Sequence, residues 1–426
     1  MTVLEFDLTK VVFPTHEGAP RKVLHVLNGA AGGAALSVLG LIEVFRRQGI
    51  AACAVCHDAG SAAERDAIRD ATEGQVLFTP LYWWNKKTRA AAWKRPLIEL
   101  RQKWRTGFPK GSVAAVARFA TECGADLIHT NNFMTPEGGL AARQLRLPHV
   151  WHVRELLGPG SPYRLPLEGP RLGPYVEQHA SKVIANSHAS AKPLQAWLPP
   201  GLLEVVPNGI DLSAFTARTG GTVRRELVVG MVGSLTSQSK KHALFIDAAA
   251  RVDRSLPIRW RIYGHDPSQG GTERGGTYIE ALHKRIAQHG LADRFDWPGF
   301  VSQPARIMNE IDVLVHPADI ESFGRIVVEA MAAGLPVVGV AGGGVGEIIA
   351  AEETGLLAPP DDPAALAAAV ERLARDTDLR TRLGAAGRRR AEQHYSIESC
   401  AAGVLRVYKM AMARPLGDRS SVTTKR

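Results

Sequence analysis

The strongest constraint on the fold is a repeated alternation of short apolar runs and helix-like segments. In the first half of the chain, runs of strand length lie at 23–28, 50–56, 126–129, 149–153, 181–186 and 204–206. A Gly-Gly pair at 32–33 and an amphipathic helical pattern over 36–47 separate the first two runs. Alternation of this kind is typical of a parallel sheet with helices on both faces.

The same alternation restarts after a polar segment at 216–225, which we interpret as a linker. Further apolar runs follow at 226–233, 258–263, 312–316 and 336–340, and 426 residues are enough for two domains. We therefore expect an α/β protein with two doubly wound domains at 1–215 and 216–395, a helix at 396–412 that packs back on the first domain, and a disordered tail at 413–426. Ligands of such sheets bind outside the carboxyl ends of the strands, which predicts a deep cleft between the domains as the site.

Composition narrows the class of protein. Glu5 and Asp7 interrupt the N-terminus where an export signal would need an unbroken apolar stretch. Four cysteines are too few for a disulfide framework, and Cys53 and Cys56 lie in an apolar run, which favours buried strand cysteines over a redox or metal site. We expect a reducing, cytoplasmic protein. The net charge of +10 fits nucleic acid, an anionic membrane or small anions without choosing among them.

The stretch ESFGRIVVE carries the most chemistry. Ser322 is a candidate N-cap, and Gly324 lies at the start of a helix whose exposed amides and positive dipole end attract phosphate. Glu321 precedes the helix and Glu329 lies inside it, and each carboxylate can accept two hydrogen bonds from a sugar diol. Spacing alone fits equally well a solvated helix cap with one buried, paired glutamate.

Two further features could bind an anion. A glycine-rich turn at 342–344 precedes a helical run, so its amides could face a ligand, although a tight strand-to-helix turn explains it as well. Lys240 and Lys241 follow a strand and a polar loop, where a lysine can neutralise a pyrophosphate. A solvated lysine pair is the alternative.

The run ESFGRIVVEAMAAGLPVV, followed by GGVGEII and TGLLAPPDDPAALAAAV, resembles the C-terminal signature of retaining glycosyltransferase family 4. VPNGIDLSAF resembles the interdomain segment of that family, and ADLIH resembles a strand that delivers residues to its cleft. The similarity spans residues 21–412 and is most specific over 313–370. It implies the GT-B fold, in which two Rossmann-like domains face one another across a deep cleft.

The resemblance implies that Glu329 binds the donor ribose, that Glu321 contacts the transferred sugar and that Lys240 contacts the diphosphate. The implied donor-binding residues are Gly32, Gly33, Ser234, Lys240, Lys241, Phe323, Gly324, Arg325 and Glu329. Ser234 stands where the family usually has arginine, and Lys241 replaces a usual glycine. Stabilisation of the leaving group would therefore rest on Lys240, helped by Lys241.

Family members also place a histidine of the N-terminal domain beside the reacting carbon. His129 and His152 are the two candidates in this chain. The family often has a second histidine where Asn131 stands here, so the choice between the two stays open. Asn131 is expected on the acceptor side, together with Arg154 and Glu155, which follow His152. A strand-end histidine without a catalytic role is the alternative for each.

The implied reaction is metal-independent transfer of a hexose from a nucleotide-diphosphate sugar to a hydroxyl acceptor, with retention and without a cofactor. Glycolipid or cell-surface polysaccharide synthesis is the expected context. Residues 81–110 interleave aromatic and basic side chains, which suit an anionic membrane surface and suit nucleic-acid stacking equally well. In the family the N-terminal domain faces the acceptor, which is often lipid-linked, so the resemblance implies a contact with the inner face of a membrane or with a lipid-linked acceptor. A solvated basic helix is the alternative, and no nucleic-acid partner is expected, because nothing else in the sequence supports one. A nucleotide-sugar epimerase and a non-catalytic binder are the competing functions.

Overall fold

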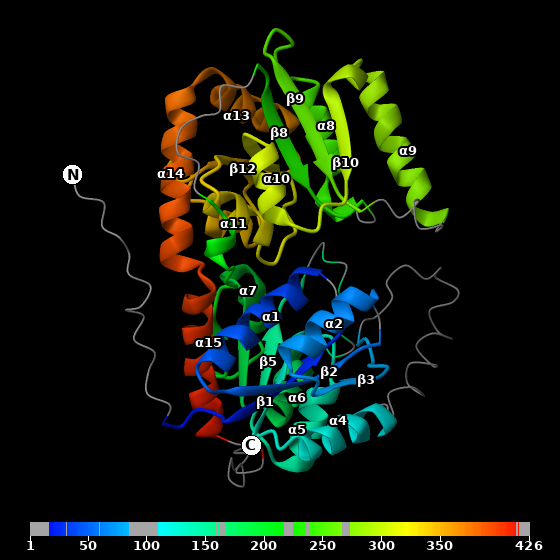
Figure 1. Ribbon diagram of the computed structural model, residues 1–426, viewed down its shortest axis with the longest axis vertical. Helices are drawn as coiled ribbons and strands as arrows, with labels where there is room; N and C mark the ends of the chain where they lie inside the picture. Colours follow the sequence, from blue (N-terminus) through cyan, green and yellow to red (C-terminus); the bar gives the residue numbers. More distant parts are fainter. Residues whose placement is uncertain are drawn as a thin grey trace, which may run out of the picture. The chain divides into compact units, whose positions relative to one another are not determined.

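The computed structural model describes residues 17–30, 32–58, 60–84, 110–158, 161, 163, 165, 167, 169–216, 225–235, 238–265, 273–414 and 416. By its contacts, the chain divides into two compact units. Unit 1 comprises 1–186, 190–209 and 397–426, and unit 2 comprises 187–189 and 210–396. Figure 1 labels most of their helices and strands.

Within its described residues, unit 1 holds a seven-stranded parallel sheet in the order β3-β2-β1-β4-β5-β6-β7. The strands are β1 (Lys22–Leu27), β2 (Ala51–Cys56), β3 (Val76–Phe78), β4 (Leu127–Thr130), β5 (His149–Val153), β6 (Lys182–Ala185) and β7 (Leu203–Val205). The helices are α1 (Gly32–Arg47), α2 (Ala62–Ala71), α4 (Lys110–Glu122), α5 (Glu137–Leu145), α6 (Leu172–His179), most of α7 (His188–Gln195) and α15 (Ile397–Met412), with a 3-10 turn at Gly169–Arg171.

Successive residues of a strand in unit 1 point to opposite faces of the sheet, as the two-residue period of a strand requires, and both faces are buried. Val23 of β1 packs with α1 and α15, whereas Leu24 packs with α4 and α5. The C-terminal helix α15 therefore belongs to the core of unit 1. Of the predicted disordered tail, all but residues 413, 414 and 416 lies outside the described residues.

As far as its residues are described, unit 2 repeats this architecture with a six-stranded parallel sheet in the order β10-β9-β8-β11-β12-β13. The strands are β8 (Leu227–Val232), β9 (Ile258–Tyr263), β10 (Phe295–Gly299), β11 (Val313–His316), β12 (Val337–Val340) and β13 (Leu356–Ala358). The helices are α8 (His242–Ala249), α9 (Glu273–Gln288), α10 (Pro304–Glu310), α11 (Arg325–Ala332), α12 (Val345–Ile348), α13 (Pro363–Arg375) and α14 (Thr377–His394), with 3-10 turns at Leu212–Ala214, Gln238–Lys240 and Ala292–Arg294.

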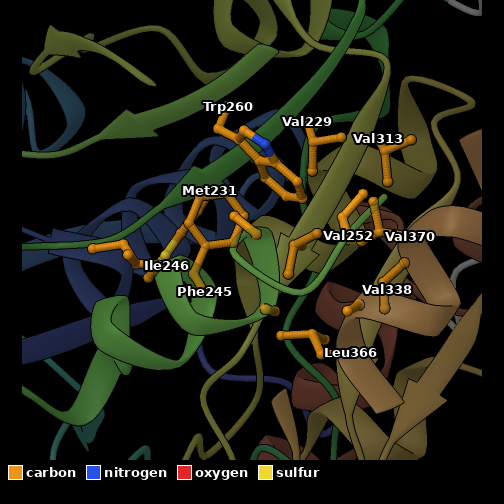
Figure 2. Close-up of a cluster of buried hydrophobic side chains, with 14 of the residues drawn as sticks. Val229, Met231, Phe245, Ile246, Val252, Trp260, Val313, Val338, Leu366 and Val370 are labelled. Carbon is orange, nitrogen blue, oxygen red and sulfur yellow. The ribbon is translucent and has the colours of Figure 1, made fainter. Parts of the chain in front are cut away.

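One face of the unit 2 sheet packs against α8 and α13 (Figure 2). There Val229 and Met231 of β8 lie in one cluster with Phe245 of α8 and Val370 of α13. The intervening Val228 faces the other way and packs with α10 and α11. Both faces are thus covered, so only the ends of the strands are open to a ligand.

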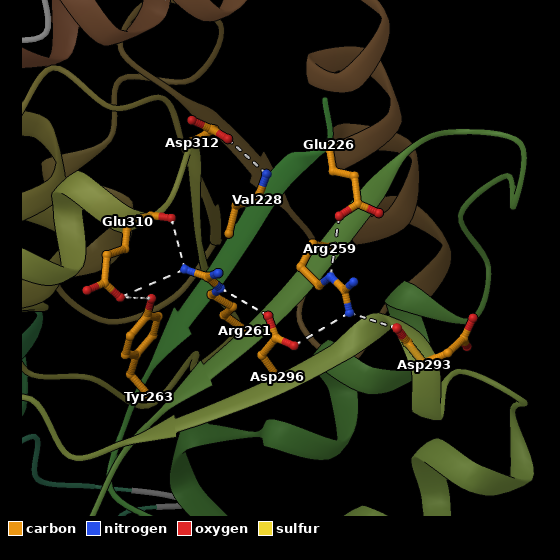
Figure 3. A network of polar contacts seen from close by, with 9 residues as sticks. All are labelled: Glu226, Val228, Arg259, Arg261, Tyr263, Asp293, Asp296, Glu310 and Asp312. Carbon is orange, nitrogen blue, oxygen red and sulfur yellow. Dashed lines mark hydrogen bonds and ion pairs between the residues drawn. The ribbon is translucent and has the colours of Figure 1, made fainter. Parts of the chain in front are cut away.

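A polar network crosses β9 and β10 near one edge of this sheet (Figure 3). Arg261 Nε donates to Asp296 across the strand pair at 3.2 Å, and Tyr263 Oη donates to Glu310 at the end of α10 at 2.9 Å. The side chains of Arg261 and Asp296 are 26% and 37% exposed, so the ion pair between them contributes at most about 1 kcal/mol to stability. We interpret this network as structural.

Helix starts follow the local sequence in both units. Ser61 and Glu64 form a capping box at α2, in which each side chain accepts a hydrogen bond from the other residue's amide. At α13, the carboxylate of Asp362 accepts from two amides of the first turn, and Pro363 occupies the first helical position. These caps satisfy amides that a helix would otherwise leave without a partner.

Periodicity located most strands to within one residue at each end, and those predicted at 149–153 and 258–263 match without any shift. The short strands β3, β10 and β13 were not predicted. Cys53 and Cys56 are buried and free in β2, which confirms the prediction of strand cysteines. Residues 217–224 of the predicted linker lie outside the described residues.

Candidate functional site

The two central strands of unit 2 decide where a ligand can bind. β8 and β11 are neighbours, but β8 leads to β9 on one side and β11 leads to β12 on the other. At such a switch point the connections diverge, and open α/β sheets bind their ligands there. Lys240 follows β8 and Glu321 follows β11, so both predicted residues leave the sheet at this point.

Lys240 and Glu321 form an ion pair beside a buried histidine. Lys240 Nζ donates to Glu321 Oε2 at 2.5 Å, and Nε2 of His316 lies 3.7 Å from the same oxygen. Burial alone would raise the pKa of Glu321, but Lys240 and His316 outweigh it and hold that pKa below its usual value. Burial lowers the pKa of His316 to about 4. At neutral pH the cluster therefore holds an ionised Glu321 carboxylate and a neutral imidazole.

Lys241 has a different environment from Lys240. Its backbone is left-handed, with φ +54°, which is the conformation that favours glycine. Its Nζ lies 2.8 Å from Asp319 and 2.7 Å from Asp361, and despite partial burial these carboxylates raise its pKa. Ser234 lies exposed just after β8.

The start of α11 differs from the prediction at one residue. Its N-cap is Gly324, with φ +95°, and no side chain caps the helix, so the expectation that Ser322 is the N-cap was wrong. A side chain on Gly324 would be strained at this φ, and its Cβ would lie 2.9 Å from Val345. The ring of Phe323 is buried in the core and packs edge-on against Tyr395. The first amides of α11 are thus free of a side-chain cap.

Glu329 is buried in α11 and paired with a second predicted residue. Arg325 Nε donates to Glu329 Oε1 at 2.8 Å, and only 4% of the Glu329 side chain is exposed. Burial raises the pKa of Glu329 in spite of Arg325. The two residues assigned to the donor therefore contact each other in this structure.

The second glycine-rich turn packs directly on the backbone that carries Glu321. The amide of Gly344 donates to the carbonyl oxygen of Glu321 at 2.8 Å. A Cβ on Gly343 would lie 2.1 Å from that oxygen, and one on Gly342 would lie 2.7 Å from the carbonyl of Asp319. Glycines are required here because two loops touch, which fixes the position of Glu321.

Unit 1 gathers its predicted residues around a row of histidines on adjacent strands. His25 of β1, His129 of β4 and His152 of β5 are all buried. The rings of His129 and His152 stack 5.4 Å apart, and their Nε2 and Nδ1 atoms lie 3.2 Å apart. Burial lowers the pKa of all three, to about 3 for His25, so each imidazole is neutral at neutral pH.

The other predicted acceptor-side residues border this row. Arg154 donates from Nη2 to His152 Nδ1 at 3.3 Å and from Nη1 to Asn208 at 2.5 Å. Asn131 donates to the carbonyl of His129 at 3.1 Å. Burial raises the pKa of Glu155 to about 7, although its Oε2 accepts from the amides of Phe133 and Arg154.

Gly32 and Gly33 form the first turn of α1. The sequence had placed them before a helical pattern that starts at residue 36. Gly32 has φ +85°, and nothing lies within 4 Å of a Cβ placed on it, so its conformation alone requires glycine. Ser37 donates to the carbonyl of Gly33 at 2.8 Å.

The aromatic and basic stretch at 81–110 is described only at its two ends. Residues 85–109, which hold all but one of its basic side chains, lie outside the described residues. Trp84 is buried and stacks on Trp151 in the core of unit 1, and its amide donates to Met134 at 2.7 Å. Trp84 is therefore part of the core, which corrects its assignment to a membrane-facing surface.

Comparison with known proteins decides the family. The family described as Glycosyltransferase Family 4 matches residues 31–214, and that described as Glycosyl transferases group 1 matches residues 217–390. A D-inositol 3-phosphate glycosyltransferase of Salinispora arenicola is 30% identical over 325 residues, which cover 70% of this chain and 71% of the relative. The chain belongs to glycosyltransferase family 4.

Other comparisons agree with this assignment. An MMP alpha-(1->4)-mannosyltransferase of Mycolicibacterium hassiacum is 28% identical over 341 residues, which cover 75% of this family 4 glycosyltransferase and 79% of the relative. Anabaena HepE, solved in complex with UDP-glucose, matches with a TM-score of 0.72 and 24% identity over 91% of this chain and 98% of that chain. The two Rossmann-like units are therefore those of the GT-B fold.

Some residues around both clusters of this glycosyltransferase were not predicted. His316 ends a buried strand just before ESFGRIVVE, so its position in the sequence could have revealed it. Tyr408 donates to or accepts from His129 at 2.6 Å across 279 positions, and no local signal points to it. In the described part of the chain, no helix is both long and apolar enough to cross a bilayer.

Proposed function

We propose that this glycosyltransferase moves a hexose from a nucleotide-diphosphate sugar to a hydroxyl acceptor with retention at the anomeric carbon. The observation that carries the proposal is the Lys240–Glu321 pair, which lies at the switch point of unit 2. A cation suits the diphosphate, and a carboxylate suits the hydroxyls of the transferred sugar. The uncapped start of α11 at Gly324 adds amides that suit an anion.

In this proposal the donor replaces contacts that the unliganded protein makes within itself. The diphosphate competes with Glu321 for Lys240, which frees the carboxylate to accept hydrogen bonds from the sugar. Glu329 likewise exchanges part of its contact with Arg325 for the ribose hydroxyls. Ser234 supplies a hydroxyl but no charge, so Lys240 stabilises most of the charge that develops on the leaving diphosphate.

The proposed transfer needs neither a protein nucleophile nor a metal. The bond from the anomeric carbon to the diphosphate oxygen breaks, and the acceptor oxygen forms its bond on the same face. The acceptor proton passes to the departing diphosphate, so charge and atoms balance. The neutral histidines of unit 1 suit uncharged hydroxyls, which supports a sugar-binding role for His152. Both ring nitrogens of His129 already contact Tyr408 and His152, so its role would be to support His152.

A direct screen can identify the nucleotide-sugar donor. Solved relatives carry UDP and UDP-glucose, and curated relatives are named for inositol phosphate and mannosyl transfer. We propose a thermal-shift screen against UDP-, GDP-, ADP- and TDP-sugars, repeated with Glu329→Ala. At least one donor should raise the melting temperature of the wild type and not that of the variant. Stabilisation by none of them would contradict the donor assignment.

Product analysis tests the finer parts of the proposal. Retention predicts that donor and product share the same anomeric configuration by NMR, and metal independence predicts unchanged turnover in EDTA. Inversion or loss of turnover in EDTA would each refute the corresponding part. Because Ser234 removes a usual charge, donor binding without any hydrolysis or transfer would instead identify a non-catalytic binder.

We further propose a lipid-linked acceptor and a peripheral location at an anionic membrane, as in glycolipid or polysaccharide synthesis. The basic side chains between 85 and 109 support this proposal by their charge. Co-sedimentation with anionic and with neutral vesicles at low salt tests it. Binding to anionic vesicles alone is expected, and absence of binding to either kind would refute it.

A further inference from the structure

Four side chains of unit 1 form one continuous row of hydrogen bonds. Tyr408 Oη lies 2.6 Å from Nδ1 of His129, whose Nε2 lies 3.2 Å from Nδ1 of His152. That same Nδ1 lies 3.3 Å from Nη2 of Arg154. All four residues are at least 92% buried, so bulk water does not complete their hydrogen bonds.

The direction of every bond in this row follows from Arg154. A guanidinium only donates, so Nδ1 of His152 must accept and its proton lies on Nε2. His129 Nε2 faces the same lone pair and must therefore also donate, which leaves Nδ1 of His129 without a proton. That nitrogen then accepts the hydroxyl proton of Tyr408.

The charge states around the row agree with this order. Burial lowers the pKa of His129 and of His152, and the charge of Arg154 lowers both further. His25 and His149 also face His129 and act in the same direction, and burial raises the pKa of Tyr408. Both imidazoles are neutral and the phenol is protonated, as the row requires.

One N–H donor of this row has no acceptor. Nε2 of His152 is buried and has no hydrogen-bond partner among the residues that the structure describes. A buried N–H without a partner loses its hydrogen bond to water and gains none in return, so such a group in a native protein points to a ligand or a bound water. His152 is the penultimate residue of β5 and so lies at the carboxyl end, where such sheets bind ligands.

We propose that Tyr408 of the C-terminal helix is a positioning residue that, with Arg154, holds His129 and His152 as Nε2–H tautomers, so that His152 presents a fixed N–H to an oxygen of the sugar substrate. The contact between His152 and the sugar rests on the proposed function, whereas the assignment of the tautomers does not. Tyr408 packs against Phe45 of α1, and Asn208 holds Arg154, so both ends of the row are anchored. The site thereby depends on a helix at the far end of the sequence.

The tautomers can be read from the ring nitrogens in long-range ¹H–¹⁵N spectra of the ligand-free full-length protein, labelled at histidine. Wild type should show neutral His129 and His152, each with its proton on Nε2. In Tyr408→Phe, Nδ1 of His129 loses its donor, so its resonance should move toward that of a nitrogen without a hydrogen bond. Tyr175→Phe removes a buried hydroxyl elsewhere in unit 1 and should leave both histidine spectra unchanged.

Activity provides the second readout. With a donor found by the screen, Tyr408→Phe should lower kcat about 2–10-fold with little change in KM for the donor, as the loss of one neutral hydrogen bond predicts. Tyr175→Phe should keep the wild-type kcat. A proton on Nδ1 of either histidine, or a Tyr408→Phe spectrum identical to that of wild type, would overturn the proposal. Because the spectra need no substrate, failure of sugar transfer alone would refute the proposed function and leave the tautomer assignment standing.

Discussion

The two units differ in how they hold polar side chains at the carboxyl ends of their parallel strands. In unit 2, Lys240 and Glu321 are 29% and 20% exposed, and Lys240 and His316 hold the pKa of Glu321 below its usual value in spite of burial. In unit 1, His129 and His152 are fully buried and neutral, and Glu155 has a pKa raised to about 7. The charged groups of unit 2 are paired with one another, whereas burial keeps most of the titratable groups at the corresponding place in unit 1 uncharged.

The difference indicates which part of a substrate each unit suits. A site that already holds paired charges can exchange a carboxylate for a diphosphate at little electrostatic cost. A neutral imidazole with a fixed tautomer suits an uncharged hydroxyl, because its single N–H can donate to the hydroxyl oxygen. The following variants test this contrast between the units.

The largest effect is expected from Lys240→Ala, which removes the cation assigned to the diphosphate. Turnover should fall about 10²–10³-fold, the usual loss for one group that stabilises developing charge. Lys240→Arg keeps the charge and should retain most of the activity, as steady-state kinetics with the identified donor would show. Wild-type turnover in Lys240→Ala would contradict the role of unit 2 as the charged half.

Glu155→Gln tests the neutral character of unit 1 through pH. Burial raises the pKa of Glu155 from its ordinary value of 4.5 to about 7, so the folded state holds the proton more tightly than the unfolded chain does. The resulting contribution to stability is present below pH 4.5 and is lost as the pH rises to about 7, by about 3 kcal/mol in all. The melting temperature of wild type should fall relative to that of Glu155→Gln across this window. Parallel curves would show that Glu155 ionises normally.

Glu329→Gln tests the proposal that Glu329 binds the ribose of the donor. Loss of a charged acceptor should weaken donor binding about 10–100-fold in a titration calorimeter. The folded protein should tolerate the change, because burial already raises the pKa of Glu329. Arg325→Met is the matched variant, since it unpairs Glu329 without removing it. If Glu329→Gln binds the donor as wild type does, the glutamate serves only to pair with Arg325.

The smallest effect is expected from Lys241→Gly. Glycine relieves a left-handed backbone conformation that costs a lysine about 1 kcal/mol, while the lost pairs with Asp319 and Asp361 are worth about as much. Chemical denaturation should therefore place the variant within about 1 kcal/mol of wild type, and turnover should change far less than in Lys240→Ala. A loss as large as that of Lys240→Ala would move the diphosphate contact to Lys241.

Sequence reasoning reached the architecture because strands and helices differ in period. It singled out Glu321 and Lys240 because both follow predicted strands, and only the resemblance to the family suggested their roles. It missed β10, whose FDWPG sequence contains proline and glycine and alternates poorly. It also misplaced the cap of α11, because a left-handed glycine can end a loop without any side-chain bond.

Long-range contacts were beyond local patterns. The glycines at 342–344 are needed because their loop touches the backbone of Glu321, a contact that only the folded chain creates. Tyr408 occupies a buried position of an amphipathic helix, where an aromatic residue normally signals packing alone. Its hydroxyl gains a partner only because α15 returns to the sheet of unit 1.

The most direct test of the central claim is the affinity of the wild type and of Lys240→Ala for nucleoside diphosphates and for the matching monophosphates. If unit 2 holds the diphosphate through Lys240, one diphosphate should bind wild type at least about 10-fold more tightly than its monophosphate, and Lys240→Ala should erase that difference. A preference for the diphosphate that survives in Lys240→Ala, or no preference in wild type, would contradict the account.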